Sequence, residues 1–462
     1  MTIAAEKETL NRLQTLSINA LKLHPFYKGK IEIACKCCIR DFNDFAIWYS
    51  PGVAEPCKAI SQNREAVYEN TNKWNTIAIV SDGTRVLGLG DVGPEASLPV
   101  MEGKSLLFKF LGGVDAYPIC LDTKNPAEII NVVKWIQPSF SGINLEDITT
   151  PKCFYILDRL RKEMKIPVWH DDQQGTATIT AAGIINALKV VNKKMKQVLI
   201  TFIGAGAANI ATSRFLTAIG AEKKNMIFCD SKGILNMQRK DLEANQESNP
   251  YKWGLCIETN EEQRGGGIKE AMKDADIVIA ASKPGPGTIV SDDIGVMADD
   301  AIVFALANPT PEIWPWDAKE AGARIIATGR SDFPNQINNS LGFPGIFRGA
   351  LDVRASAITD EMCLHAAFEL AKIAEERGLH EEYIVPKMDD WEIYPREAVA
   401  VGIKAMKQGI AGIKCTREEL FEKSNSIINK ARNKTNMLMK KGFIALPPDE
   451  DFLRRLKNER NK

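Results

Sequence analysis

The sequence lacks the features of a membrane-spanning or secreted protein. Nowhere in its 462 residues do 18 apolar residues follow one another, and the first stretch, MTIAAEKETLNRLQTL, has no apolar run suited to a signal peptide. Lys and Arg number 59 and Asp and Glu also number 59, so no net charge is available to hold a nucleic acid or an anionic membrane. We therefore predict a cytoplasmic protein that binds neither nucleic acid nor membrane.

Histidine is scarce and cysteine is scattered. The ten Cys include one cluster, Cys35, Cys37 and Cys38, and no second pair accompanies it to complete a tetrahedral zinc site. Three of the four histidines lie far from any other motif; the four are His24, His170, His365 and His380. We expect reduced thiols and a catalytic mechanism that does not depend on a His base.

The composition favours several packed α/β domains, because hydrophobic residues make up 45% of the chain and charged residues 26%. Residues 1–73 are polar and helix-prone, with breaks at His24-Pro25 and Ser50-Pro51, and we predict a helical cap or dimer segment there. We expect an α/β catalytic domain over residues 74–172 and 331–462, with a helical C-terminus. A Rossmann-type, doubly wound dinucleotide-binding domain over residues 173–330 interrupts it.

Short β-branched runs support this division. The first block contains TIAIVSDG, AYPICLD and IPVWHDD, and each run ends in a carboxylate. The second contains VLITFIGAG, NMIFCD, ADIVIAAS, AIVFALANP and RIIATG, separated by helix-length segments. Residues 331–351 are rich in Pro, Gly and Asn and are expected to form a structured loop. The chain from Thr359 onward is expected to be helical, and its basic end lacks aromatics, which favours a solvated helix face over a binding patch.

A glycine turn opens the second block. Gly204 and Gly206 follow a strand and precede a helical run that starts near Ala207, so backbone amides there can approach a pyrophosphate. Asn209 stands where the usual fingerprint has its third glycine. Asp230 ends the next strand, 21 residues beyond Asn209, near the spacing of a ribose-binding acid. The pattern predicts a dinucleotide site; the alternative is a tight turn with nothing bound.

Two acidic pairs lie at predicted strand ends. Glu146-Asp147 and Asp171-Asp172 would meet in one crevice, where carboxylates repel one another unless a cation lies between them. Oxygen ligands favour Mg²⁺ or Mn²⁺ over zinc. Any one of these acids alone would be better explained as a helix cap or a solvated loop end.

Several long motifs resemble those of malic enzymes. They are YSPGVAEPCKAI, SDGTRVLGLGDVGPEASLPVMEGKSLLFK, GINLEDI, HDDQQGTA, FALANPTPE and NQINNSLGFPGIFRGALD, in order from about Lys30 to Gly409. The chain is most similar to the shorter, bacterial-type branch of that family. Gln174, where HDDQHG would have a His, and Asn209 depart from the pattern of close relatives.

The resemblance implies oxidative decarboxylation of L-malate to pyruvate and CO₂ by a homodimer or larger assembly, with Mg²⁺ or Mn²⁺ and a nicotinamide cofactor. It implies Lys104 as general base with Asp171 beside it, and Tyr49 as general acid. The implied metal ligands are Glu146, Asp147 and Asp172, and the residues implied to hold the substrate carboxylates or the nicotinamide end are Arg85, Asn308 and Asn339.

This chemistry is physically consistent. A lysine accepts the hydroxyl proton of malate only when it is neutral, which a nearby cation favours and Asp171 opposes; the sequence does not decide between the two effects. A metal can stabilise negative charge on the substrate as CO₂ leaves, and a tyrosine can then protonate C3.

The cofactor preference depends on the residues after Asp230. That carboxylate suits the free 2′-hydroxyl of NAD, whereas Ser231 and Lys232 could take a 2′-phosphate, and we favour NADP with NAD as the alternative. Three rival functions remain: a malolactic-type enzyme that retains its cofactor and releases lactate, another nicotinamide-dependent dehydrogenase, and a nucleotide-sensing protein without turnover. The carboxylate crevice argues against the second, and the combination of acid, base and metal ligands argues against the third.

Overall fold

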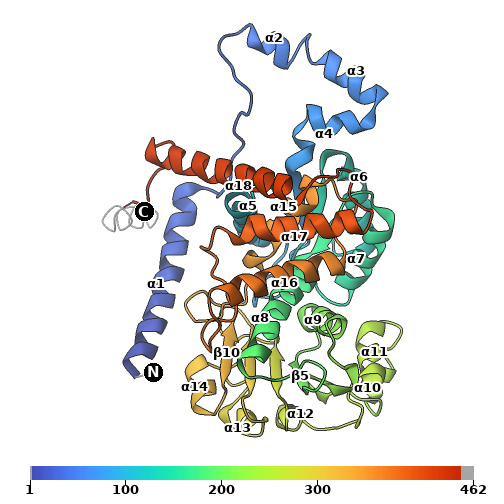
Figure 1. Cartoon of the computed structure of the whole chain (residues 1–462), viewed down its shortest axis with the longest axis vertical. Helices are drawn as coiled ribbons and strands as arrows, with labels where there is room; N and C mark the ends of the chain where they lie inside the picture. The colour runs from blue at the N-terminus through green and yellow to red at the C-terminus, as the bar shows by residue number, and fades with distance from the viewer. Residues whose placement is uncertain (1–2, 449–462) are drawn as a thin grey trace.

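The computed structural model describes residues 3–448, which form two mainly parallel β-sheets flanked by helices (Figure 1). This α/β architecture confirms the predicted fold class, with a Rossmann-like sheet as the second of the two. Among the described residues, no helix is long and apolar enough to cross a bilayer.

The first sheet has four strands in the order β2-β1-β3-β4. They are β1 (Thr76–Ser81), β2 (Asp115–Cys120), β3 (Gly142–Leu145) and β4 (Val168–His170), and the helices between them are α5 (Pro94–Gly112), α6 (Pro126–Ile136) and α7 (Lys152–Glu163). All residues of β1, β3 and β4 are buried, as expected for a parallel sheet covered on both faces.

The strand order of this sheet reverses between β1 and β3, and ligands bind at such a switch point, outside the carboxyl ends of the strands. Val80 pairs with Leu145, and Leu145 pairs with His170. The loops after β1, β3 and β4 therefore begin side by side, which brings Glu146 next to Asp171.

The second sheet has the order β10-β9-β8-β5-β6-β7. Its strands are β5 (Ile200–Ile203), β6 (Met226–Asp230), β7 (Gly233–Ile234), β8 (Ile277–Ala280), β9 (Ile302–Ala305) and β10 (Ile325–Thr328), and its shorter helices are α10 (Lys240–Glu243), α11 (Pro250–Glu258), α12 (Ile268–Met272), α13 (Ser291–Ile294) and α14 (Pro315–Glu320). Five strands match the predicted runs. The sixth, β7, pairs antiparallel with β6 and is too short for a sequence pattern to indicate.

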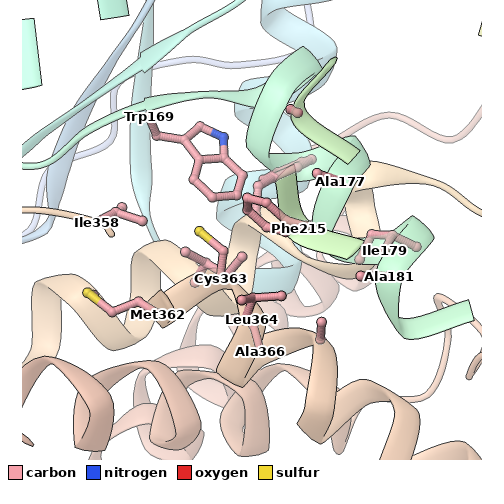
Figure 2. Close-up of a cluster of buried hydrophobic side chains, with 14 of the residues drawn as sticks. Trp169, Ala177, Ile179, Ala181, Phe215, Ile358, Met362, Cys363, Leu364 and Ala366 are labelled. Atoms are coloured by element: carbon pink, nitrogen blue, oxygen red, sulfur yellow. The ribbon is translucent and has the colours of Figure 1, made fainter. Parts of the chain in front are cut away.

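One hydrophobic core joins the two sheets. Alternate residues of the second sheet face opposite sides: Phe202 belongs to the core shared with the first sheet, and Ile203 to a smaller core on the other face. Figure 2 shows part of the shared core, where Trp169 of β4, Phe215 of α9 (Ala207–Ala218) and Cys363 of α16 (Asp360–Glu376) lie together. Helix α8 (Thr176–Val190) packs against both α9 and α16.

The C-terminal helices are α15 (Phe343–Asp352), α16, α17 (Ile393–Lys407) and α18 (Arg417–Lys440). The prediction of a loop over residues 331–351 is wrong for its second half, which is the fully buried helix α15. Its glycines reflect close packing: a Cβ at Gly345 would clash with the carboxylate of Glu397, and one at Gly349 with the backbone of Ala398. The last basic run, LRRLKNERNK, lies outside the described residues.

The N-terminal region contains α1 (Ile3–Tyr27), α2 (Asp44–Trp48), α3 (Ala54–Gln62) and α4 (Val67–Asn70). The predicted break at Pro25 is wrong, because α1 continues to Tyr27. We call residues 31–62 the N-terminal arm; its α2 and α3 project from the body at the top of Figure 1. Its exposed apolar side chains include Ile33, Phe42, Phe45, Ile47 and Trp48.

Candidate active site

Three carboxylates meet at the carboxyl ends of β3 and β4. One oxygen each of Glu146, Asp147 and Asp172 lies within 4.8 Å of the others. Asp147 has a φ of 55°, a left-handed conformation that Asp tolerates better than most residues, and its backbone N–H donates to Asp172 Oδ2 at 3.0 Å. The backbone therefore holds the two aspartates of this cluster together.

Burial and mutual repulsion raise the pKa values of Glu146 and Asp147 in this cluster. Burial, and then the neighbouring carboxylates, raise the pKa of Glu146 well above its usual value, although Lys104 opposes the shift. Burial and the charge of Asp172 raise the pKa of Asp147 to about 8. Asp147 Oδ2 is buried and has no hydrogen-bond partner among the described residues. A buried acceptor among oxygen ligands fits a divalent cation such as Mg²⁺ or Mn²⁺.

Lys104, on α5, is bonded to two of the acids. Its Nζ donates to Asp171 Oδ2 at 2.5 Å and lies 3.0 Å from Glu146 Oε1. It also lies 4.3 Å from the centre of the Phe343 ring. Burial lowers the pKa of Lys104, but Asp171 and Glu146 raise it further, and the net shift is upward.

Asp171 is fully buried and held from several sides. Trp169 Nε1 donates to its Oδ1 at 3.2 Å, and Asn339 Nδ2 donates to its Oδ2 at 2.7 Å. Asn339 in turn accepts a hydrogen bond from Thr176 at 3.1 Å. A Cβ at Gly175 would clash with the Asp171 carboxylate, so the glycine leaves room for it.

A cavity of about 710 Å³ brings these groups together with the second sheet. A Cβ at Gly88, in the loop after β1, would lie 2.6 Å from the carbonyl oxygen of Asn308, so the loops of the two sheets are in contact. The predicted residues that line this cavity are Arg85, Lys104, Glu146, Asp147, Asp171, Asp172, Gly206, Ala207, Asn308 and Asn339.

The glycine turn after β5 forms the opposite wall. Gly204 has a φ of 100°, and a Cβ there would lie 2.7 Å from the carbonyl oxygen of Ala281, so the position needs glycine. Asn209 does not line the cavity. Its amide donates hydrogen bonds to the carbonyls of Ile203 and Gly204 at 3.0 and 2.8 Å, and these bonds stabilise the turn. Gly206 caps the N-terminus of α9 and faces the cavity.

Glu312 is a buried residue that the sequence reasoning missed. Its carboxylate accepts hydrogen bonds from Ser282 N at 2.8 Å, Ser282 Oγ at 3.1 Å and Ala307 N at 3.0 Å. These donors belong to the loops after β8 and β9, which both line the cavity. Glu312 therefore joins the two loops. It is the last residue of the motif FALANPTPE, in which the sequence reasoning assigned a role only to Asn308.

Asp230 lies at the end of β6, outside this cavity. Its carboxylate is bonded to Arg239 and Lys252, two cations that the sequence reasoning also missed. The next residues, Ser231 and Lys232, form an exposed turn.

Tyr49 does not meet Lys104 within the chain. It follows α2 on the N-terminal arm, its side chain is 75% exposed, and it is not among the residues that line the cavity. The proximity of Tyr49 to the base therefore stays a prediction, and it needs a structural explanation.

The fold and site define a class of protein. The second sheet is parallel except for β7, and a glycine turn follows its first strand, as in dinucleotide-binding domains. A ligand bound at that turn would face a lysine surrounded by carboxylates. The chain matches the malic enzyme N-terminal domain family over residues 28–161 and the malic enzyme NAD-binding domain family over residues 173–408. This chain belongs to the malic enzyme family.

Individual proteins similar to this chain are also malic enzymes. The bifunctional malic/malolactic enzyme of Bacillus subtilis is 46% identical over 413 residues, covering 89% of this chain and 98% of its own. The NAD-dependent malic enzyme of Geobacillus stearothermophilus is 47% identical over 383 residues, covering 83% and 78%. The crystal structure of Entamoeba histolytica malic enzyme superposes with a TM-score of 0.94 at 44% identity, covering 99% of this chain and 96% of that one. Other relatives are named NADP-dependent malic enzymes.

Proposed function

We propose that this chain oxidises and decarboxylates L-malate to pyruvate and CO₂ while reducing NAD or NADP. One observation carries the proposal. In a single cavity, a lysine bonded to two carboxylates faces the glycine turn of a dinucleotide-binding sheet, and two more carboxylates lie beside it. The lysine and the carboxylates suit removal of a proton from a hydroxyl beside a cation. The glycine turn suits binding of a nicotinamide cofactor, which accepts the hydride.

Glu146, Asp147 and Asp172 would hold the divalent cation. Their oxygens are the ligands that Mg²⁺ and Mn²⁺ prefer, and Asp147 Oδ2 is without a partner in the described part of the chain. When bound, the cation supplies Lewis-acid stabilisation of negative charge on the substrate as CO₂ leaves.

Lys104 is the proposed acceptor of the 2-hydroxyl proton, and Asp171 orients it through their hydrogen bond. Burial lowers the pKa of Lys104, but the carboxylates of Asp171 and Glu146 raise it more. A divalent cation held beside it would counter their charge and favour the neutral amine that this role needs.

Arg85, which lines the cavity, suits a substrate carboxylate because guanidinium and carboxylate pair well. Asn308, which also lines the cavity, is proposed to hold the nicotinamide end of the cofactor. Asn339 has a second task besides substrate binding, since its amide already supports Asp171.

We place Tyr49 in the active site of a second copy of this chain. The arm that carries it exposes several large apolar side chains, and such a surface is expected to be covered. A homodimer in which each arm reaches the partner's cavity would cover that surface and would bring a proton donor to each Lys104. This explains how a tyrosine remote from the base within one chain can act beside it.

The preferred cofactor is proposed to be NADP, since cations surround the end of β6. A cytoplasmic location stays a prediction.

The rival with specific support is malolactic activity, which the name of the Bacillus subtilis relative includes. Product analysis separates the two: purified protein with L-malate, Mn²⁺ and either nucleotide should yield pyruvate with matching reduced nicotinamide. Lactate without net nucleotide reduction would favour the malolactic reaction.

A further inference from the structure

Asp82, directly after β1, is a buried acid outside the active-site cavity. Its side chain is fully buried, and it is not among the residues that line the cavity. The Nζ of Lys152, the first residue of α7, donates a hydrogen bond to Asp82 Oδ2 and a second, at 3.3 Å, to the carbonyl of Lys124. The Lys152 side chain is only 14% exposed. Because an isolated buried carboxylate is costly, this ion pair compensates a charge that the proposed reaction does not use.

The other oxygen of Asp82 organises the loop that follows β1. Asp82 Oδ1 accepts hydrogen bonds from the backbone N–H of Thr84 at 3.1 Å and from its hydroxyl at 2.6 Å. The Thr84 hydroxyl oxygen in turn accepts a hydrogen bond from the backbone N–H of Thr149, in the segment after β3, at 3.0 Å. The loop after β1 is thereby tied at two points to the segment that connects β3 to α7.

These two segments carry groups of both proposed binding sites. Arg85, proposed to hold a substrate carboxylate, follows Thr84 directly, and Asp147, proposed to hold the cation, lies shortly before Thr149. The backbone N–H of Arg85 donates to the carbonyl of Asp147 at 2.9 Å. The N–H of Leu87 donates to Asp147 Oδ1 at 3.4 Å. A shift of one segment would therefore change the positions of the substrate ligand and the metal ligand together.

A second ion pair on the loop after β1 is exposed. Lys124 Nζ contacts Asp91 at 2.6 Å, and their side chains are 63% and 48% exposed. Exposed pairs contribute little to stability, and neither of these residues lines the cavity. Of the two pairs, the buried one also holds Thr84. The position of the loop is therefore expected to depend on Asp82 and Lys152 more than on the exposed pair.

We propose that Asp82 and Lys152 are positioning residues for malate and for the divalent cation. Their ion pair fixes the spacing between Arg85 and Asp147, so that one malate can meet the guanidinium and the cation together. This inference rests on the proposed function. Loss of the pair should weaken the binding of malate and of the cation, and it should leave the glycine turn of the second sheet unaffected.

Binding and turnover are measured separately in full-length wild type and Lys152→Met. Electron paramagnetic resonance of free Mn²⁺, without malate or nucleotide, gives the Kd of the cation, and fluorescence titration gives the Kd of NADPH. Steady-state rates at saturating Mn²⁺ give kcat and the KM for L-malate. Loss of a hydrogen bond to a charged group should raise the Kd for Mn²⁺ and the KM for malate about tenfold each. The kcat should change less than about threefold and the Kd for NADPH less than about twofold, because Lys104 and the glycine turn lie outside this hydrogen-bond network.

A second pair of variants avoids leaving the buried Asp82 without its cation, a change that can prevent folding. Thr84→Val removes the hydroxyl that links Asp82 to Thr149 and leaves the ion pair intact, and it should raise the same two constants. Thr84→Ser keeps the hydroxyl and should behave like wild type. If Lys152→Met does not fold, Thr84→Val alone decides.

Further controls separate positioning from general stability. Lys152→Arg retains the cation and should keep both constants near those of wild type. Lys124→Met removes the exposed pair on the same loop and should change neither constant. An unchanged Kd for Mn²⁺ and KM for malate in the folded variants, or an equal rise in the Kd for NADPH, would overturn the inference even if the melting temperature falls. Failure of the proposed function would appear separately, as a wild type that binds Mn²⁺ but reduces neither nucleotide with L-malate.

Discussion

At the scale of single residues, the site depends on how Lys104 is held. Its Nζ contacts two carboxylates, and one of them, Asp171, is fixed in turn by Trp169 and Asn339. A base positioned in this way is already oriented before substrate arrives, which reduces the entropic cost of the proton transfer. Tyr49 carries no such support within the chain. Substitution of Lys104 and substitution of Tyr49 are therefore expected to slow different steps of the reaction.

Lys104→Ala should slow hydride transfer from malate by about 10²–10⁴-fold, because the acceptor for the hydroxyl proton is lost. Tyr49→Phe retains that acceptor and should instead slow the exchange of pyruvate C3 protons with solvent. Single-turnover nucleotide reduction and proton NMR of pyruvate measure the two steps. Normal C3 exchange in Tyr49→Phe would show that the tyrosine does not donate the proton.

Glu312 provides a pH-dependent prediction. Burial raises its pKa from 4.5 to about 7, despite the hydrogen bonds it accepts. Between these values the folded protein holds a proton that the unfolded chain has released, so the contribution of Glu312 to stability is full below about pH 4.5 and lost as the pH rises through about 7. The shift corresponds to about 3 kcal/mol at about 1.4 kcal/mol per pKa unit.

Urea unfolding of wild type and Glu312→Gln at pH 5 and pH 8 isolates this residue from other titrating groups. The stability advantage of wild type over the variant should shrink by up to about 3 kcal/mol at the higher pH. An equal difference at both pH values would mean that the carboxyl is ionised throughout this range.

At the scale of elements, α15 connects the core to the active site. It follows directly after the turn that carries Asn339, and it packs closely on α17, where Gly349 lies against the backbone of Ala398. A side chain at that glycine would have to push two buried helices apart. The support that Asn339 gives to Asp171 therefore depends on helix packing some distance away.

Gly349→Ala should destabilise the protein by about 1–3 kcal/mol, the usual cost of forcing an extra group into a packed core. The matched control is Gly254→Ala in α11, where a Cβ would meet nothing within 4 Å. That change should be neutral or stabilising by up to about 1 kcal/mol, since Ala favours a helix over Gly. Denaturant unfolding of both variants checks the prediction, which a neutral Gly349→Ala would contradict.

Sequence patterns indicated the strand ends well because buried parallel strands appear as apolar runs, and this brought Glu146, Asp171 and the glycine turn to the correct edges. The patterns did not indicate α15, because its glycines suggest a loop until the neighbouring helices are known. Lys252 was missed because only the fold brings it beside Asp230. The domain boundaries after residues 73, 172 and 330 stay predictions.

At the scale of the whole molecule, the N-terminal arm determines whether one chain can act alone. If Tyr49 acts across a homodimer, each site needs Lys104 from one subunit and the tyrosine from the other. Two inactive variants can then complement each other. A mixed dimer of Tyr49→Phe and Lys104→Ala subunits would contain one complete site and one site that lacks both residues.

The mixed dimer should therefore show about half the activity of a wild-type dimer, while each parental dimer is close to inactive. Co-expression with two different affinity tags and sequential purification isolates it. If the tyrosine acts within its own chain, both sites of the mixed dimer are incomplete and activity stays at the parental level. That result would contradict the exchange of arms.

In the proposed reaction, the groups of this one cavity oxidise malate at C2 and then release its C4 carboxylate. The most direct measurement uses L-malate labelled with ¹³C at C4 or, in a parallel sample, at C1, with Mn²⁺ and NADP or NAD. The label should leave as CO₂ only from C4, in amounts equal to the pyruvate and reduced nicotinamide formed, and excess chelator should stop all three. Label released from C1, CO₂ without nucleotide reduction, or full activity in excess chelator would contradict it.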